Sequence, residues 1–412
     1  MRVFKFGGAS VRDAQSIKNV VDVLHYQQFK QCLIVVSAMG KTTNALEAVV
    51  ASYFNDEDYQ KGIQNIKTEH LDIAQNLFES QHPVFEEISL FFDDIEAFLR
   101  RNKSPKYSFV YDQVVSCGEL ISSKILSAYL KSQKFDNQWL DARDYIKTND
   151  NYREGLVDWS ATEARISELD PNQCYVTQGF IGSDANNFSV TLGREGSDYS
   201  AAIFAYSLNA KEMVIWKDVP GVMTGDPRKF KEVRLLSNIS YEEAIEMAYF
   251  GASVIHPKTL QPLKQKHIPF YVKSFLEPQQ PGTKIGNSDK NQELESYILK
   301  EHQYLMKIST RDFSFIAEDH ISYIFDLLSK NKIKVSLMQN SAISLALCLE
   351  DKYHKLETLN ETLQENFKTE VHSDVALYTV RHADMNKIAH FYEGKTILLE
   401  QISKNTLQVV TA

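Results

Sequence analysis

The stretch "CLIVVSAMG" (32–40) is a continuous apolar run that stops abruptly at small residues. A strand covered by helices on both faces of a parallel sheet has this pattern, because none of its side chains faces water. The segment "RVFKF" (2–6) reads as an earlier strand that ends at Gly7 and Gly8. Between the two strands, "SIKNVVDVLHYQ" (16–27) has the apolar spacing of a helix. The order strand, helix, strand predicts neighbouring parallel strands.

The alternation of strands and helices continues through the first two-thirds of the chain. Further strands are predicted at 174–182 and 212–219, and further helices at 119–130 and 200–210. Repeated strand–helix units predict an α/β fold with a mainly parallel sheet sandwiched by helices. Residues 55–107 are mostly polar with helical spacing, and we interpret them as a helical insertion or lid.

The composition of the sequence changes near residue 285. The stretch "EPQQPGTKIGNSDKNQ" (277–292) is rich in proline, glycine and polar residues, so we place the end of a first domain, 1–285, there. The segments that follow have the order βαββαβ, which predicts a ferredoxin-like unit within 300–412. About 30 residues remain after this unit; they contain "KIAHFYEG" (387–394) and two short strands, too few for a second complete unit.

Composition excludes several classes of protein. The net charge of −9 leaves no general basic surface for nucleic acid. The four cysteines form no CxxC pair, which disfavours metal clusters and disulfides and indicates a reducing cytoplasm. The N-terminus lacks the apolar region of a secretory signal, and no apolar run approaches the ~18 residues of a membrane span.

Polar clusters follow the predicted strands, where parallel sheets bind ligands. Lys5 with Gly7 and Gly8 is suited to a phosphate, although a glycine pair also marks ordinary turns. In "SAMGKTTN" (37–44), a P-loop would need glycine at position 35, and Val35 excludes it. The hydroxyl groups of this stretch suit a carboxylate or phosphoryl oxygen, or they only cap a helix.

Three acidic and basic groups follow later strands. Glu119 is predicted to open a helix after Gly118, either as a partner of the helix dipole or as a receptor for a substrate ammonium. Arg194 is bracketed by glycines in "TLGREGSDYSA" (191–201), so its guanidinium can grip a carboxylate or simply face solvent. Asp198 lies at the start of the next helix, as a cap or as a second acid for the ammonium. The loop "WKDVPGVMTGDPRKF" (216–230) can wrap a nucleotide or be a long turn.

At these residues the sequence resembles the aspartate kinases of the amino-acid-kinase superfamily. The resemblance covers roughly 1–285 in order and continues into an ACT-type regulatory region. The motifs that carry it are "KFGGAS" (5–10), "VVSAMGKTTN" (35–44), "SCGELISSKIL" (116–126), "TQGFIG" (177–182), "TLGREGSDYSA" (191–201), "WKDVPGVMTGDPR" (216–228), "SYEEAIEMAYFGASVIHPKTL" (240–260) and "PFYVKSF" (269–275).

The resemblance implies roles for individual residues. Lys5 would contact the phosphoryl group that is transferred, and Asp198 would be the second catalytic residue. The residues implied for the substrate, L-aspartate, are Ser37, Thr43, Glu119, Arg194, Gly196 and Ser197, with Asp198 as a second acid for the ammonium. The residues implied for ATP are Lys5, Phe6, Gly7, Gly8, Lys217, Asp218, Met223, Asp226 and Arg228. Mg²⁺ is implied as a cofactor, without assigned protein ligands.

The implied reaction is transfer of phosphate from ATP to the β-carboxylate of L-aspartate. The products are 4-phospho-L-aspartate and ADP, at the head of lysine, threonine, methionine and diaminopimelate synthesis. Two alternatives remain open: a related kinase acting on another small acid, and an amino-acid-sensing regulator with an inactive kinase domain.

Several positions depart from the pattern of the family. Ala9 stands in place of a common threonine, and Glu195 in place of a common glycine, where we expect its side chain to face solvent. The family usually carries two ACT modules, whereas here the second is abridged to its terminal strands. Ala342 replaces a glutamate typical of lysine-sensitive members, which argues against lysine inhibition through the usual contacts. The unpaired sheet edge predicts a homodimer through 300–412.

Overall fold

The computed structural model describes residues 1–26, 31–252, 255–287, 294–384 and 394–412. The chain divides into two compact units, and each is described by itself. The first unit comprises 1–222, 235–245 and 254–292, and the second comprises 223–234, 246–253 and 293–412. Two short segments that precede residue 285 therefore group with the C-terminal part of the chain.

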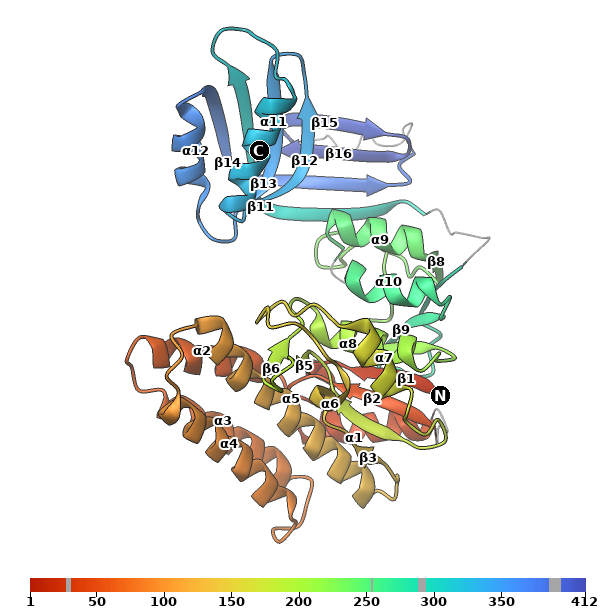
Figure 1. The fold of residues 1–412 in the computed structure, drawn as a ribbon. Helices are drawn as coiled ribbons and strands as arrows, with labels where there is room; N and C mark the ends of the chain where they lie inside the picture. Colours follow the sequence, from red (N-terminus) through yellow and green to blue (C-terminus); the bar gives the residue numbers. More distant parts are fainter. Residues whose placement is uncertain (27–30, 253–254, 288–293, 385–393) are drawn as a thin grey trace. The chain divides into compact units, whose positions relative to one another are not determined.

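An eight-stranded sheet forms the centre of the first unit, in the order β3-β4-β2-β1-β7-β9-β10-β8 (Figure 1). All neighbouring strands are parallel except β9 and β10. The mainly parallel sheet expected from the apolar runs is confirmed. Its strands are β1 (Arg2–Phe6), β2 (Cys32–Val36), β3 (Gln138–Trp139), β4 (Tyr175–Gln178), β7 (Met213–Lys217), β8 (Asn238–Ser240), β9 (Phe270–Ser274) and β10 (Thr283–Gly286).

Helices and a short hairpin surround this sheet. The segment predicted as a helical insertion contains two long helices, α3 and α4, which pack on each other and on α2 and α5 (Figure 1). The hairpin consists of β5 (Ile181–Ser183) and β6 (Ser189–Thr191). The helical elements are η1 (Gly8–Val11), α1 (Ala14–Tyr26), α2 (Thr42–Phe54), α3 (Gln60–Gln75), α4 (Val84–Arg101), α5 (Tyr107–Ser132), α6 (Ala142–Tyr145), α7 (Trp159–Ile166), α8 (Gly196–Ser207), α9 (Tyr241–Phe250) and α10 (Pro257–Gln265).

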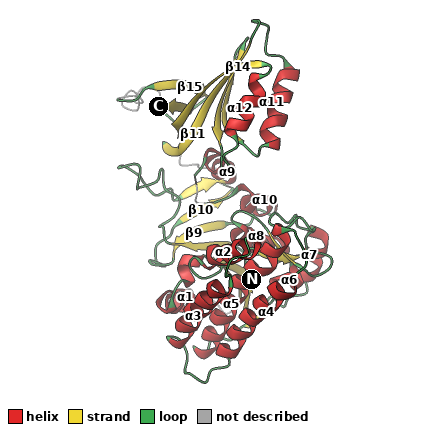
Figure 2. Cartoon of the chain, turned by 90° about the vertical axis from the view of Figure 1, so that its left-hand side faces the viewer, coloured by secondary structure: helices red, strands yellow, loops and turns green. Residues whose placement is uncertain are grey.

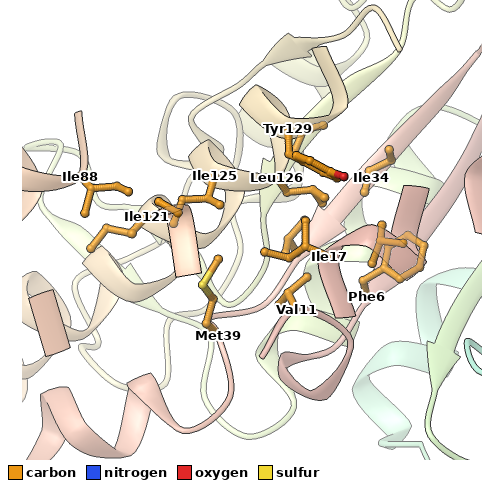
Figure 3. Packing of buried hydrophobic residues seen from close by; sticks show 14 of the residues in the cluster. Phe6, Val11, Ile17, Ile34, Met39, Ile88, Ile121, Ile125, Leu126 and Tyr129 are labelled. Atoms are coloured by element: carbon orange, nitrogen blue, oxygen red, sulfur yellow. The ribbon is translucent and has the colours of Figure 1, made fainter. Parts of the chain in front are cut away.

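The apolar core explains why the runs in the sequence are continuous. All five residues of β2 are buried, as expected for a strand with helices on both faces. Figure 3 shows side chains of the strands, of α1 and of α5 gathered in one cluster; among them are Phe6, Ile17, Ile34, Ile125 and Leu126. The long helix α5 is thereby fixed against the sheet, and it carries two buried carboxylates that are described below.

The second unit contains a six-stranded antiparallel sheet in the order β12-β13-β11-β14-β16-β15. The first four strands of this order and two helices form the predicted βαββαβ unit, and β16 extends the sheet from β14. Both helices cover the same face of the sheet (Figure 2). The elements are β11 (Ser296–Thr310), α11 (Glu318–Lys330), β12 (Lys334–Asn340), β13 (Ser344–Glu350), α12 (Leu356–Gln364), β14 (Phe367–Arg381), β15 (Ile397–Ser403) and β16 (Thr406–Thr411). The segment 387–394 lies almost entirely outside the described residues.

Candidate active site

Two lysines at the carboxyl ends of neighbouring strands meet on one buried aspartate. Strands β1 and β7 are parallel and in register, with Lys5 opposite Ile215. The Nζ atom of Lys5 lies 2.8 Å from Oδ1 of Asp198, and Nζ of Lys217 lies 3.4 Å from Oδ2. Asp198 lies in the first turn of α8. Three residues that are far apart in the sequence therefore form one charged group at the sheet edge where ligands are expected.

The electrostatics of Asp198 follow from this arrangement. Burial alone would raise the pKa of its carboxyl group, because the charged form is poorly solvated. The positive charges of Lys5 and Lys217 outweigh burial, and they hold the pKa of Asp198 below its usual value. The carboxylate therefore stays ionised at neutral pH. The cluster carries two positive charges and one negative charge, so it retains a net attraction for an anion.

Backbone from the ends of β1 and β2 surrounds the lysine group. The amide of Ser37 donates to the carbonyl of Phe6 at 3.1 Å, and the amide of Gly40 donates to the carbonyl of Gly8 at 3.1 Å. A β-carbon at Gly8 would lie 2.9 Å from the carbonyl oxygen of Ala38. Only glycine permits this close approach. The turn after β1 therefore packs closely on the turn after β2, beside the lysines.

Glu119 is almost completely buried, and its position corrects one expectation. It does not open a helix, because α5 begins at Tyr107 and Glu119 lies in its middle. Its carboxyl group accepts hydrogen bonds from the backbone of Ala38 and the hydroxyl of Thr43, while Oε2 is buried without a hydrogen-bond partner among the described residues. Burial raises the pKa of Glu119 to about 8. A buried carboxyl group with one oxygen that lacks a hydrogen-bond partner is suited to bind a cationic group of a ligand.

Ser37 and Thr43 lie on either side of the turn that faces Glu119. The carbonyl of Ser37 accepts a hydrogen bond of 2.7 Å from the hydroxyl of Ser122, which also belongs to α5. Thr43 lies in the first turn of α2 and contacts Glu119 itself. The structure therefore brings Ser37, Thr43 and Glu119 together, as the sequence predicted.

Arg194 lies on a tight turn between β6 and α8. Gly193 and Glu195 on either side of it have φ values of +78° and +52°, in the left-handed region. Arg194 is exposed, and within the described parts of the chain it makes no ion pair. Its guanidinium is thus available for a carboxylate, which it can bind through two parallel hydrogen bonds.

The side chain of Glu195 does not face solvent, contrary to expectation. It is half-buried, and its Oε2 atom is buried without a hydrogen-bond partner in the described part of the chain. Burial raises the pKa of Glu195; the charge of Lys217 opposes this rise, and the charge of Asp198 adds to it. The carboxyl group of Glu195 is therefore near enough to Lys217, Asp198 and Lys5 to be affected by their charges. No pattern in the sequence signals this burial, because it depends on the backbone conformation of the turn.

Gly196 and Ser197 are held by the turn after β4. A β-carbon at Gly196 would lie 2.6 Å from the ring of Phe180, and one at Gly179 would lie 2.5 Å from the β-carbon of Ser197. The amide of Phe180 donates to the hydroxyl of Ser200 at 2.9 Å. The start of α8, which carries Asp198, therefore packs closely against the turn that follows β4.

The remaining predicted nucleotide residues follow β7 in the chain. Asp218 is exposed. Met223, Asp226 and Arg228 belong to the second unit, where the guanidinium of Arg228 binds the carboxylate of Asp226 at 2.7 Å. Their assignment to the nucleotide site stays a prediction.

Sequence reasoning missed one further buried acid, Asp112, on α5. Its carboxylate accepts hydrogen bonds from the backbone amides of Arg153 and Thr191 and from the Thr191 hydroxyl. The spacing of seven residues between Asp112 and Glu119, which places both on one face of a helix, was the available signal.

Two further properties of the described residues bear on the site. No group of three or more histidine, cysteine, aspartate or glutamate side chains there is arranged to hold a metal ion. No helix in the described part of the chain is both long and apolar enough to cross a membrane.

Comparison with known proteins places this site in context. Residues 1–274 match the Amino acid kinase family. The chain is 33% identical over 357 residues to lysine-sensitive aspartokinase 3 of Escherichia coli (strain K12), a match that covers 84% of this chain and 78% of that protein. It is 31% identical over 386 residues to the aspartokinase of Chlamydia pneumoniae, covering 92% and 84%. The crystal structure of E. coli aspartokinase III with aspartate and ADP has a TM-score of 0.82 at 28% identity, covering 100% of this chain and 96% of that one.

Proposed function

The chain belongs to the amino acid kinase family as an aspartokinase, and from this premise we propose which of its residues transfer phosphate from ATP to aspartate. The reaction joins two anions, the substrate β-carboxylate and the nucleotide triphosphate. The protein must therefore hold both close together and neutralise the charge that develops between them. The observation that carries the assignment is the group formed by Lys5, Asp198 and Lys217 at one edge of the sheet.

On the nucleotide side, Lys5 contacts the transferring phosphoryl group and Lys217 the neighbouring phosphate oxygens. The backbone from Phe6 to Gly8 surrounds the phosphates, in a turn that packs closely on Ala38 because position 8 has no β-carbon. Asp198 holds both ammonium groups in place before the nucleotide arrives. This preorganisation supports the proposed roles, because charges that are already fixed cost no reorganisation during the reaction.

On the aspartate side, each polar group of the substrate has a partner of suitable chemistry. Arg194 binds the α-carboxylate, with support from the backbone of Gly196 and Ser197. Glu119 and Asp198 receive the ammonium, and Ser37 and Thr43 hydrogen-bond the β-carboxylate. The buried Oε2 atom of Glu119, which lacks a partner among the described residues, supports this assignment.

The transfer needs no protein nucleophile and no general base. The β-carboxylate of aspartate is ionised at neutral pH and attacks the γ-phosphorus directly, so that one P–O bond forms while the bond to ADP breaks. The bonding pair leaves with the ADP oxygen, and the product is 4-phospho-L-aspartate. What the protein supplies is positioning, which is worth roughly 7–11 kcal/mol in favourable cases.

Mg²⁺ is proposed to enter with the nucleotide. Among the described residues no three carboxylate, histidine or cysteine side chains converge on one point, so phosphate oxygens and water would supply most of its ligands. When bound, the ion would neutralise charge on the phosphates.

The second unit is proposed to be an ACT-type regulatory and dimerisation region. Phe313 and Phe315 are 79% and 74% exposed, and Met338 and Ile343 are also exposed on this unit. Apolar side chains of this size are costly in water and suit a contact with a second copy. Light scattering at micromolar concentration should show a dimer that Phe313→Ser with Phe315→Ser converts to monomer. A monomeric wild-type protein would contradict the proposal.

The biological setting follows as a proposal from the reaction. The product would enter lysine, threonine, methionine and diaminopimelate synthesis. All four cysteines are free thiols, which suits a reducing cytoplasm. Ala342 offers no carboxylate, so inhibition by lysine through that position is not expected.

A substrate panel tests the function, and two variants test the roles. Hydroxylamine traps the acyl phosphate, and the trapped product should form with aspartate and ATP but not with glutamate or acetylglutamate; release of ADP from ATP should likewise not be stimulated by UMP. Arg194→Ala should raise KM for aspartate at least about tenfold and leave KM for ATP near that of the wild type. No aspartate-dependent turnover, as in an inactive regulator, would refute the function. An unchanged KM for aspartate would refute only the role of Arg194.

A further inference from the structure

Asp112 is buried among groups that the reaction itself does not use. It is 0% exposed, although an ionised carboxylate is costly in such a place. Its Oδ2 atom accepts hydrogen bonds of 2.9 Å from the amides of Arg153 and Thr191, and its Oδ1 atom accepts one of 2.8 Å from the Thr191 hydroxyl. These partners are 41 and 79 residues away in the chain. One side chain therefore joins α5 to two separate segments.

Both segments lead to the turn that presents Arg194. Thr191 is the last residue of β6, three positions before Arg194. Arg153 also lies against this turn, since a β-carbon at Gly193 would lie 3.2 Å from the carbonyl oxygen of Arg153. The amides of Thr191 and Arg153, both bonded to Asp112, thus hold the Arg194 turn at two points. One point is the end of β6, and the other is the loop of Arg153 that contacts Gly193.

Asp112 and Glu119 lie on the same face of one helix. They are seven residues apart, which corresponds to two turns and about 10 Å along the axis. Glu119 is the proposed receptor for the ammonium of aspartate, and Arg194 is the proposed clamp for its α-carboxylate. A rigid helix that carries both Glu119 and the anchor of the Arg194 turn fixes the separation between these two binding groups.

The side chain of Arg153 connects the same anchor to α2. Its Nη2 atom lies 2.9 Å from Oε1 of Glu47, and its guanidinium carbon lies 4.0 Å from the ring centre of Tyr111. Glu47 lies one turn after Thr43, which itself contacts Glu119. Arg153 has a φ of +73°, a backbone conformation that is unfavourable for a side chain of this size. The hydrogen bond from its amide to Asp112 helps to hold it there.

From these contacts we infer that Asp112 is a positioning residue for aspartate: it sets the distance between the Arg194 turn and Glu119, and so determines affinity for the amino acid without touching it. The inference rests on the proposed roles of Arg194 and Glu119. It predicts an effect on one substrate only, because the three hydrogen bonds described above all lead to the segments around Arg194.

Kinetic constants of three variants test the inference. Asp112→Ala leaves two amides and a hydroxyl unpaired, and it should raise KM for aspartate at least about tenfold with KM for ATP within about twofold of wild type. Asp112→Asn has the same shape; its amide oxygen can accept from both backbone amides, and its NH₂ can donate to Thr191. It should therefore restore KM for aspartate. Thr191→Val removes a single hydrogen bond and should give an intermediate KM, which decides the question if Asp112→Ala does not fold.

Ser127→Ala is the matched control. Ser127 is buried on the same helix and donates a hydrogen bond of 2.7 Å to Asn137, far along α5 from the Arg194 turn. Its loss should lower the melting temperature while both KM values stay unchanged. A rise of both KM values together in Asp112→Ala, or an unchanged KM for aspartate in Thr191→Val, would overturn the inference. If Arg194→Ala, measured in parallel, is the one variant that raises KM for aspartate, the proposed binding site stands and only the anchoring role of Asp112 is refuted.

Discussion

The ammonium of Lys5 lies 2.8 Å from Oδ1 of Asp198, and both side chains are more than nine-tenths buried. A buried ion pair gains stability from its Coulomb attraction but costs desolvation, so it is seldom retained for stability alone. Here a second ammonium, that of Lys217, shares the same carboxylate. The arrangement fixes two cations at a site that must receive phosphates. Asp198 thus holds both lysines in place at this site.

Lys5→Ala should lower kcat by roughly 100-fold to 1000-fold, the range found when one group that stabilises transition-state charge is removed. KM for aspartate should change little, because Arg194 and Glu119 remain. Steady-state kinetics with both substrates measure this difference. Lys266→Ala, which removes an ion pair with Glu163 outside the site, serves as control and should leave kcat unchanged. If Lys5→Ala raises KM for aspartate by a larger factor than it lowers kcat, then Lys5 binds aspartate and does not act on the phosphoryl group.

Binding of aspartate should depend on pH through Glu119. Burial raises the pKa of Glu119 to about 8 in the free protein, so at pH 7 most molecules carry the neutral acid. A substrate ammonium needs the carboxylate, and binding must therefore release a proton. Below pH 8, the KM for aspartate should fall by up to about tenfold for each unit of rising pH. Calorimetry in buffers of different ionisation enthalpy would detect the released proton directly.

The stability of the free protein supplies a check on this reasoning. The unfolded chain ionises Glu119 near its ordinary pKa of 4.5, whereas the folded chain keeps the proton up to about pH 8. The unfolded state binds fewer protons between these values, so the free energy of unfolding should decrease as pH rises through this window. Glu119→Gln should abolish this contribution and the pH dependence of KM. If Glu119→Gln keeps the wild-type pH profile of KM, another group titrates.

Glu195 should weaken ATP binding relative to glycine at the same position. Its carboxyl group is half-buried and affected by the charges of the lysine cluster, and its φ of +52° is unfavourable for any residue with a β-carbon. Glu195→Gly should stabilise the fold by about 1 kcal/mol and lower KM for ATP a few-fold. Glu195→Gln keeps the backbone strain and removes the charge, so it should lower KM for ATP without the gain in stability. Higher KM values in both variants would show that the carboxylate assists the nucleotide.

Much of the site could be predicted from the sequence because parallel strands end at a common edge. That rule predicts that Lys5 and Lys217, each near the end of an apolar run, lie at the same edge of the sheet, and the pairing of β1 with β7 brings them together. It could not show that Gly118 lies inside a helix. A β-carbon there would lie 3.2 Å from side-chain atoms of Ala38 and Thr42, so Gly118 allows α5 to approach α2 and does not precede the start of a helix.

Long-range hydrogen bonds account for the residues that the sequence did not reveal. The amides that donate to Asp112 come from a loop and a hairpin that only folding brings near. The partial burial of Glu195 likewise belongs to a turn with a left-handed backbone angle. Apolar periodicity carries information about which face of an element is buried, and none about such contacts.

Gly179 should be as important for aspartate binding as a contact residue, because it allows α8 to start where it does. A β-carbon at Gly179 would lie 2.5 Å from the β-carbon and 2.7 Å from the α-carbon of Ser197. The Ser197 backbone cannot yield without moving Asp198 in the same helical turn. Gly179→Ala should therefore lower the melting temperature and raise KM for aspartate by at least about tenfold. Gly286→Ala is the matched control, since nothing in the described part of the chain lies within 4 Å of its β-carbon position, and both its melting temperature and its kinetics should stay near wild type. Wild-type kinetics for Gly179→Ala would mean that the start of α8 can shift without disturbing the substrate, and the close packing would then have no part in binding.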